Sequence, residues 1–332
     1  MFKLNEKTIV REKFPNNETK VKDFEESLVD DENLLEFEYT DKEQLITLMF
    51  IKHRIDSLAK KCKLKIICDC KEELFTREIM SFIHDLCFTE IEFVLNFKYH
   101  TDIDLVNLYS INKIISTSEL KKHKVQLFIW YMPYSRMDRK IEGDVFTLEY
   151  VCLMLNSMCL DKVYIVEPHS NVTMNLLKNS YAIYPAKEWL PIIKEKVGFK
   201  PTDSIVLPDK GAKKRYGEFE KEICILDKKR NPTTGEILSM NIIEGSVNKD
   251  STCIIIDDLC SKGGTFEYAA RILKSLGAKK VYLVVTHCEE NIFNGKLLDS
   301  DSPIDKIFTS RSILSTEHEK IEFIDIEVTD YV

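Results

Sequence analysis

Short apolar runs alternate with helix-like segments along most of the chain, and this alternation restricts the possible fold more than any other feature. The helix-like segments at 147–158 and 266–276 space their apolar residues by three and four, as helices that cover a sheet do. The runs predicted to be strands are Lys65–Cys68, Ile91–Leu95, Val125–Tyr131, Val163–Val166, Ser204–Leu207, Ile223–Leu226, Cys253–Ile256 and Val281–Thr286. Strands and helices in alternation predict an α/β fold with mainly parallel sheets flanked by helices.

The chain is long enough for more than one domain of this kind. It has 332 residues, and a typical domain has about 150. The simplest boundary lies near residue 160, between the predicted helix that ends around Met158 and the predicted strand that begins at Val163. We therefore expect an N-terminal domain over residues 1–160 and a C-terminal domain over residues 161–332.

Charge and hydropathy argue against two classes of partner. Lys and Arg number 47 against 55 Asp and Glu, which gives a net charge of −8. Nucleic-acid binding needs a basic surface, so we expect no nucleic-acid partner. No segment approaches the ~18 apolar residues of a membrane span, and the first thirty residues contain no run typical of a signal peptide. We expect no membrane partner either.

The cysteines indicate a reducing compartment. Ten cysteines are spread from Cys62 to Cys288 without paired CxxC spacing, which is typical of reduced thiols. Cys68 and Cys70 form a CxC pair, but no second ligand pair follows at the spacing of a zinc site, and a buried strand pair is the simpler interpretation. The expected location is cytoplasmic.

The strongest local motif is CIIIDDLCSKGGT, at residues 253–265. A buried strand runs into two acids and then into a Gly-Gly-Thr turn that opens a helix. Such a turn brings backbone close to an anion, and the helix N-terminus adds positive dipole. Asp257 and Asp258 can accept hydrogen bonds from vicinal hydroxyls or hold a divalent cation. The motif predicts a sugar-phosphate site; the alternative is that two acids simply end a strand.

Five further segments, in order with this one, resemble the ribose-phosphate pyrophosphokinase family, whose members make phosphoribosyl pyrophosphate (PRPP). The segments are KFPNNE (13–18), YMPYSRMDRK (131–140), VEPHS (166–170), VLPDKGAKKR (206–215) and LDKKRNP (226–232). The resemblance spans residues 13 to about 287, with a poor match between about 70 and 124. It implies two domains of the type I phosphoribosyltransferase kind. It also implies magnesium-dependent transfer of a diphosphoryl group from ATP to ribose 5-phosphate, with AMP as the second product.

The resemblance also implies roles for individual residues. Lys228 and Arg230 match catalytic loop cations, and His169 and Asp209 match positions that organise Mg²⁺. The implied ATP-binding residues are Phe14, Asn16, Glu18, Arg136, Asp138 and His169. The implied ribose 5-phosphate-binding residues are Asp257, Asp258, Ser261, Lys262, Gly263, Gly264 and Thr265. The implied pyrophosphate-binding residues are Asp209, Lys210 and Gly211. A homo-oligomer, a dimer or larger, is expected, with the loop from Phe14 to Glu18 at an interface.

The sequence departs from the family pattern in several places. Ser261 and Lys262 stand where Asp and Thr are usual, Met137 replaces a Gln, and Glu167 replaces an Asp. An insertion at about 65–120 reads strand, helix, strand, helix, and we expect part of it to supply a sheet layer that the short N-terminus lacks. These departures leave a non-catalytic regulatory or scaffolding subunit as an alternative to an active synthase. A second alternative is a phosphoribosyltransferase that consumes PRPP, which explains the motif at 253–265 but not the other segments.

Overall fold

The chain forms two compact units, each built on one sheet. The computed structural model describes residues 2–4, 8–10, 34–39, 63–70, 80, 90–117, 123–140, 143–217, 223–230 and 237–332. The first unit comprises Met1–Ile165, Ser170–Ala182 and Val328–Val332, and the second comprises Val166–His169 and Ile183–Glu327. The predicted domain limits, 1–160 and 161–332, stay a prediction.

The first unit contains an eight-stranded sheet among the described residues. Strands β3 to β7 run parallel, whereas β1 pairs antiparallel with both β2 and β3. The strand order is β2 (Thr8–Val10), β1 (Phe2–Leu4), β3 (Leu34–Tyr39), β4 (Lys63–Asp69), β5 (Glu90–Phe97), β6 (Lys124–Ile129), β7 (Lys162–Val166) and β8 (Ser180–Ile183). Strands β4 and β5 arise from the segment expected to be an insertion, and both lie within this sheet, as the hypothesis of a supplied sheet layer requires.

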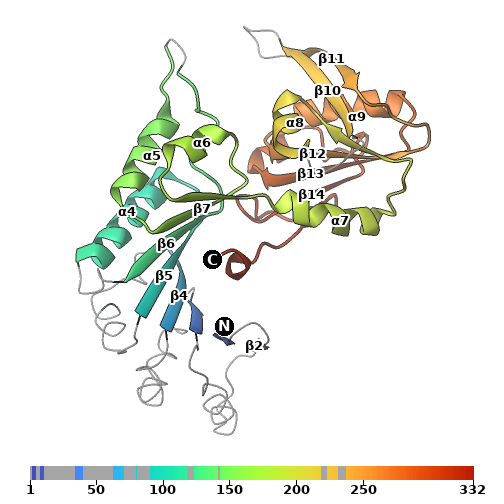
Figure 1. Ribbon diagram of the computed structural model, residues 1–332. Coiled ribbons are helices and arrows are strands. Elements are labelled where there is room, and N and C mark those ends of the chain that lie inside the picture. Colours follow the sequence, from blue (N-terminus) through green and yellow to red (C-terminus); the bar gives the residue numbers. More distant parts are fainter. Residues whose placement is uncertain are drawn as a thin grey trace. The chain divides into compact units, whose positions relative to one another are not determined.

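Helices cover one face of this sheet (Figure 1). They are α4 (Asp102–Thr117), α5 (Thr147–Ser157) and α6 (Asn171–Leu176). Leu108 and Ile111 of α4 and Leu148 and Leu155 of α5 are buried in one cluster with alternate residues of the strands, such as Phe93. The three- and four-residue spacing of apolar side chains places them all on the face toward the sheet, which is why these segments are helices here.

The second unit contains a seven-stranded sheet among the described residues. Its strands are parallel except for the β10–β11 hairpin. Their order is β11 (Ile237–Glu244), β10 (Ile223–Arg230), β9 (Ser204–Leu207), β12 (Thr252–Cys260), β13 (Lys280–Cys288), β14 (Lys306–Thr309) and β15 (Ile321–Phe323). The central strands are continuous apolar runs because parallel strands in such folds are buried on both faces.

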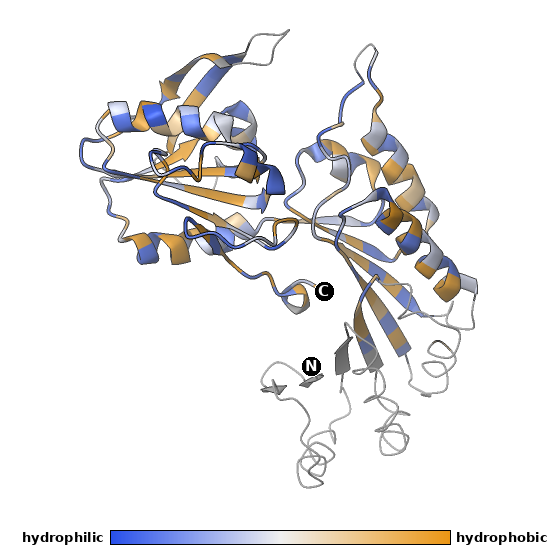
Figure 2. Cartoon of the chain, turned by 180° about the vertical axis from the view of Figure 1, so that it is seen from behind, coloured by the Kyte–Doolittle hydropathy of each residue, from blue (hydrophilic) through white to orange (hydrophobic). Residues whose placement is uncertain are grey.

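Helices lie on both faces of the second sheet, and Figure 1 shows α7 and α9 on opposite sides. The helical elements are α7 (Pro185–Val197), α8 (Lys210–Tyr216), α9 (Gly264–Ser275) and the short 3₁₀ helix η3 (Glu290–Asn294). A second 3₁₀ helix, η4 (Val328–Asp330), belongs to the first unit. Phe266, Ala269, Ala270 and Leu273 of α9 pack into the core. Figure 2 shows apolar residues on the strands of both sheets and on parts of the helices.

Most expected elements that fall within the described ranges are confirmed. Every predicted strand has a counterpart, although β6 ends at Ile129, earlier than the expected Tyr131. Both predicted sheet-covering helices are present as α5 and α9, and Gly277 has the left-handed φ of 103° expected where α9 ends. Of the strand, helix, strand and helix expected at about 65–120, the strands are β4 and β5 and the second helix is α4, whereas the first helix falls on residues outside the described ranges, apart from Met80.

Two further observations concern the cysteines and the helices. Cys68 and Cys70, like the other described cysteines, are free thiols rather than disulfide partners. Within the described ranges, no helix has both the length and the apolar character that crossing a membrane requires.

Candidate active site

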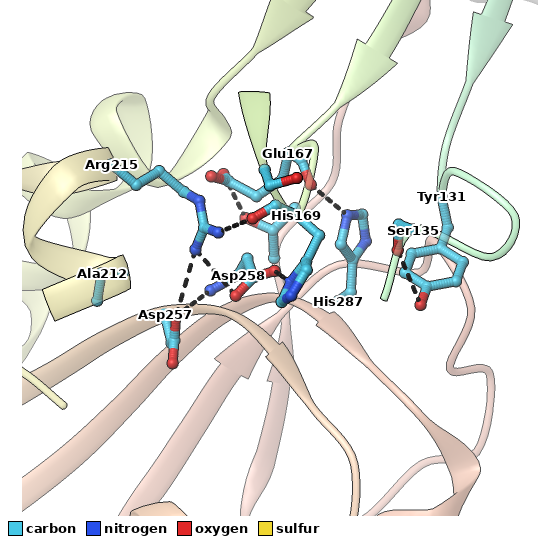
Figure 3. A network of polar contacts seen from close by, with 12 residues as sticks. Tyr131, Ser135, Glu167, His169, Ala212, Arg215, Asp257, Asp258 and His287 are labelled. Atoms are coloured by element: carbon cyan, nitrogen blue, oxygen red, sulfur yellow. Dashed lines mark hydrogen bonds and ion pairs between the residues drawn. The ribbon is translucent and has the colours of Figure 1, made fainter. Parts of the chain in front are cut away.

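The candidate site of the second unit begins where β7 ends. Glu167, Pro168 and His169 follow this strand, and Glu167 has a left-handed φ of 44°, which is uncommon for a residue other than glycine. Nδ1 of His169 lies 2.6 Å from Oδ2 of Asp258, near the end of β12. The predicted strand-end histidine and the predicted acid pair are therefore brought into direct contact (Figure 3).

The two acids of β12 differ in their environment. Burial and the neighbouring Asp258 charge raise the pKa of Asp257 well above its usual range. Burial also raises the pKa of Asp258, but the hydrogen bond to His169 and the charge of Arg215 outweigh burial, so the net pKa shift is downward. Asp258 is thus held ionised, and an ionised carboxylate at 2.6 Å requires a proton on Nδ1 of His169.

Arg215 is a site residue that the sequence interpretation missed. Its Nη1 lies 2.9 Å from Oδ1 of Asp258 and 3.3 Å from Oδ1 of Asp257, while Nη2 donates to the backbone carbonyl of His169. Burial lowers its pKa, but the surrounding negative charges raise the pKa by more. Arg215 ends the family-like segment VLPDKGAKKR, which is the signal that could have identified it, but as part of a basic run it received no role of its own.

The buried acid Glu167 holds the loop after β7 in place. Glu167 is 2% exposed, and its carboxylate accepts hydrogen bonds of 2.9 Å from both the Tyr216 hydroxyl and the Thr286 hydroxyl. Burial raises the pKa of Glu167 to about 7, against the lowering effect of Arg215 and of the two hydroxyls. Since the acid points into the protein, it holds the loop instead of facing a ligand.

The predicted phosphate turn adopts the geometry that an anion cradle needs. Gly263 has a φ of 80° and caps α9, which begins at Gly264, with Thr265 next in its first turn. A Cβ on Gly263 would lie 2.2 Å from Cδ1 of Leu297, so only glycine fits. The helix N-terminus directs its positive dipole at this turn.

The two residues before Gly263 are placed differently. Oγ of Ser261 accepts a 3.2 Å hydrogen bond from Nδ2 of Asn291, so η3 holds this part of the turn. Lys262 is exposed, and its backbone packs so closely on Gly295 that a Cβ there would lie 2.0 Å from the Lys262 carbonyl oxygen. Contacts with η3 and with Gly295 therefore fix the turn.

The predicted pyrophosphate and cation residues meet at α8. Oδ1 of Asp209 accepts hydrogen bonds from the Gly211 and Ala212 amides at 2.8 and 3.0 Å, and thereby caps the helix. Its Oδ2 lies 2.6 Å from Nζ of Lys228 on β10. Burial raises the pKa of Asp209, but Lys228 and the two amides outweigh burial and the net pKa shift is downward. Lys210 is exposed and lies 3.6 Å from Asp227.

The remaining predicted site residues belong to the first unit or have side chains outside the described residues. Arg230 ends β10, and its side chain lies outside the described residues. Arg136 and Asp138 belong to the first unit, where Arg136 is exposed and Asp138 lies 3.5 Å from Nε of Arg139. The loop residues Phe14, Asn16 and Glu18 lie outside the described residues.

The donor set bears on the expected magnesium. Within the described part of the chain, no group of three or more His, Cys, Asp or Glu side chains forms a metal site. Mg²⁺ needs only one or two protein carboxylates when it arrives on a phosphate substrate and keeps several waters. Asp209 supplies a carboxylate of that kind and His169 lies at the end of β7 in the same unit, so the two residues expected to organise Mg²⁺ fit an ion that is carried by the nucleotide.

Comparison with known proteins agrees with these features. Residues 217–316 match the family model described as a phosphoribosyl transferase domain. A ribose-phosphate pyrophosphokinase of Pyrococcus abyssi (strain GE5 / Orsay) is 30% identical over 249 residues, which cover 70% of this chain and 80% of the relative. Another, from Saccharolobus solfataricus, is 31% identical over 206 residues, with 60% and 68% covered.

Comparison of structures gives the same fold. The crystal structure of phosphoribosylpyrophosphate synthetase from Mycobacterium smegmatis matches with a TM-score of 0.55 at 14% sequence identity. The match covers 88% of this chain and 94% of that chain. At this identity the structural likeness establishes the fold alone.

Proposed function

The chain belongs to the ribose-phosphate pyrophosphokinase family, and we propose that it transfers the terminal diphosphoryl group of ATP to ribose 5-phosphate. The anomeric hydroxyl oxygen attacks the β-phosphorus of ATP. The bond between that phosphorus and the oxygen of AMP breaks, the hydroxyl proton is released, and PRPP and AMP are formed. The observation that best supports this reaction is the contact of the β7 strand-end His169 with the β12 acid pair, next to a glycine turn that opens α9.

The second unit offers a place for each end of ribose 5-phosphate. The 5-phosphate suits the turn from Ser261 to Thr265, where Gly263 allows close approach and the helix N-terminus favours an anion. The ring hydroxyls suit Asp257 and Asp258, since carboxylate oxygens accept hydrogen bonds from vicinal hydroxyls. Lys262 is exposed beside the turn and adds positive charge for the phosphate.

Cations are needed because several phosphate charges must come together. Catalysis of such a transfer is mainly positioning and electrostatic stabilisation. Lys228 stands beside Asp209, Lys210 and Gly211, where we place the pyrophosphate group, and we assign Lys228 and Arg230 to the charge that develops during transfer. Magnesium carried by ATP would be held by Asp209 and His169, where it would neutralise phosphate oxygens.

The remaining predicted residues complete the proposal. Arg136, Asp138 and His169 bind the ATP phosphates. The loop with Phe14, Asn16 and Glu18 receives the adenine across the interface of a homo-oligomer.

Formation of both products from both substrates tests the proposal. Purified protein is incubated with ATP and Mg²⁺, with and without ribose 5-phosphate, and AMP and PRPP are quantified by mass spectrometry. Equal amounts of AMP and PRPP that depend on the sugar are expected. If neither product forms while ATP or ribose 5-phosphate still raises the melting temperature, the chain is a non-catalytic binding subunit and the proposal fails.

A further inference from the structure

Arg215 joins three elements of the candidate site through a single side chain. It lies on α8, its side chain is only 11% exposed, and its guanidinium contacts both acids of β12 and the backbone carbonyl of His169 (Figure 3). A buried charge is costly unless it is fully paired, so an arginine in this place needs all of these partners. The two basic residues before it on the helix do not resemble it, since Lys213 and Lys214 are exposed.

The carboxylate oxygens of Asp257 and Asp258 have different partners. The guanidinium takes Oδ1 of Asp257 and Oδ1 of Asp258, at 3.3 and 2.9 Å. His169 takes Oδ2 of Asp258, and the Asp258 amide donates to Oδ1 of Asp257. The contacts of Asp257 with Arg215 and with the Asp258 amide are made by its Oδ1, and Figure 3 shows one oxygen of Asp257 pointing away from the network. The second oxygen of Asp257 is therefore held in a fixed direction, where it can accept a further hydrogen bond.

Two adjacent carboxylates would not stay in this arrangement on their own. Like charges at this separation repel, and each side chain would turn toward solvent or take up a proton. The planar guanidinium presents its donors in fixed directions, so Nη1 contacts both carboxylates while Nη2 donates to the His169 carbonyl, whereas a lysine carries all its donors on one nitrogen.

The part of α8 that carries Arg215 is itself held in place by the contacts of Tyr216. Tyr216, the next residue, donates its hydroxyl to the buried Glu167, which also accepts from Thr286 of β13. The guanidinium carbon lies 5.5 Å from the centre of the Tyr216 ring. Consecutive residues of α8 thus attach the helix to the loop after β7, one through its side chain to a carbonyl and the other to a carboxylate.

We propose that Arg215 is a positioning residue for ribose 5-phosphate: it aligns Asp257 and Asp258 so that the outward oxygen of Asp257 accepts a ring hydroxyl of the sugar. This assignment rests on the proposed function. Arg215 contacts protein groups instead of substrate in this arrangement, so its removal affects the sugar more than the nucleotide. A merely structural arginine would instead lower stability and impair both substrates together.

The test compares Arg215→Gln, Arg215→Lys and the control Lys214→Gln, which makes the same charge change at an exposed position of the same helix. For each protein, the melting temperature, kcat, and KM for ribose 5-phosphate and for ATP are measured, and ribose 5-phosphate binding is measured by calorimetry. Loss of charge-assisted hydrogen bonds predicts a rise of roughly 30-fold in KM and Kd for ribose 5-phosphate in Arg215→Gln. KM for ATP is expected to change less than about threefold, with partial recovery in Arg215→Lys and no change in Lys214→Gln.

The possible outcomes separate this assignment from the proposed function. A wild-type protein that makes PRPP while Arg215→Gln keeps its affinity for ribose 5-phosphate, or loses affinity equally for both substrates, overturns the role of Arg215 alone. A wild-type protein that neither turns over nor binds ribose 5-phosphate overturns the proposed function and this assignment with it. If Arg215→Gln fails to fold, the same split between sugar and nucleotide is required of Arg215→Lys, and its absence there overturns the role.

Discussion

Lys228 Nζ lies 2.6 Å from Oδ2 of Asp209, and the other oxygen of that carboxylate caps α8 through the Gly211 and Ala212 amides. One side chain thus fixes both a helix N-terminus and a cation. Because the cation is held by a carboxylate, a pyrophosphate group bound as we propose would compete with Asp209 for Lys228. The ion pair therefore keeps the Lys228 ammonium close to the place where we propose that the pyrophosphate group binds.

Replacement of Lys228 is expected to affect turnover far more than stability. If Lys228 acts as cations of other phosphoryl-transfer enzymes do, Lys228→Ala lowers kcat by about 10³-fold or more. The matched control is Lys229→Ala, because Lys229 is the next residue of β10 and is exposed. Kinetics with both substrates saturating, together with circular dichroism, measure the two effects. Equal turnover by Lys228→Ala and Lys229→Ala would remove Lys228 from the mechanism.

Two replacements of Asp209 separate its roles as helix cap and as anion. Asn caps helices as well as Asp does, whereas Ala does not, so Asp209→Ala is expected to lose about 1 kcal/mol more stability than Asp209→Asn. Both variants lose the ion pair with Lys228 and should be impaired in turnover. Urea unfolding measures the first difference and kinetics the second. Identical stabilities of the two variants would show that the cap contributes nothing.

The sequence was sufficient to predict the parallel sheets because their strands are continuous apolar runs. CIIIDD, for example, becomes the central strand β12, with both faces buried. The sequence interpretation left out β8, β11, β14, α7 and α8. Strand β11 is an edge strand with exposed Leu238 and Ile243, and short polar elements such as α8 lack the periodicity that identifies a helix.

The candidate site was predictable only as a set of segments. The motifs placed His169, Asp209, Lys228 and the acid pair in one family pattern, but their contacts depend on tertiary packing. Arg215 shows the limit, because its side chain is only 11% exposed whereas the two lysines before it in the same basic run are exposed. Which of them turns inward is set by the carboxylates of a strand some forty residues later, and no local pattern encodes that.

The glycines of the phosphate turn should respond differently to substitution. Gly263→Ala places a side chain at a φ of 80° and a Cβ 2.2 Å from Leu297, whereas a Cβ on Gly264 meets nothing within 4 Å. Gly263→Ala is expected to lose about 2 kcal/mol or more, from strain and a forced shift of Leu297, while Gly264→Ala keeps its stability. Thermal and urea unfolding of the two variants are the measurement. A Gly263→Ala variant as stable as Gly264→Ala would contradict the packing described here.

His287 makes the stability of the second unit depend on pH. Its Nδ1 lies 2.8 Å from Ser312 Oγ and its Nε2 lies 3.1 Å from the Val166 carbonyl oxygen, with the ring fully enclosed. Burial lowers the pKa of His287 to about 4, despite the nearby Asp258 carboxylate. In the unfolded chain the pKa returns to about 6.5.

The sign of the pH effect follows from these two values. Above about pH 6.5 the imidazole is neutral in both states, and its contribution to stability is constant. As the pH falls from 6.5 to 4, the unfolded chain binds the proton and the folded protein does not, so the free energy of unfolding falls by on the order of 3 kcal/mol. His287→Asn should remove this part of the slope between pH 4 and 6.5, even though lost packing lowers its stability at every pH. The control is His100→Asn, since His100 is exposed, and that variant should keep the wild-type slope. Urea unfolding at several pH values measures the slopes, and an unchanged slope in His287→Asn would mean that His287 takes up its proton in the folded protein as readily as in the unfolded chain.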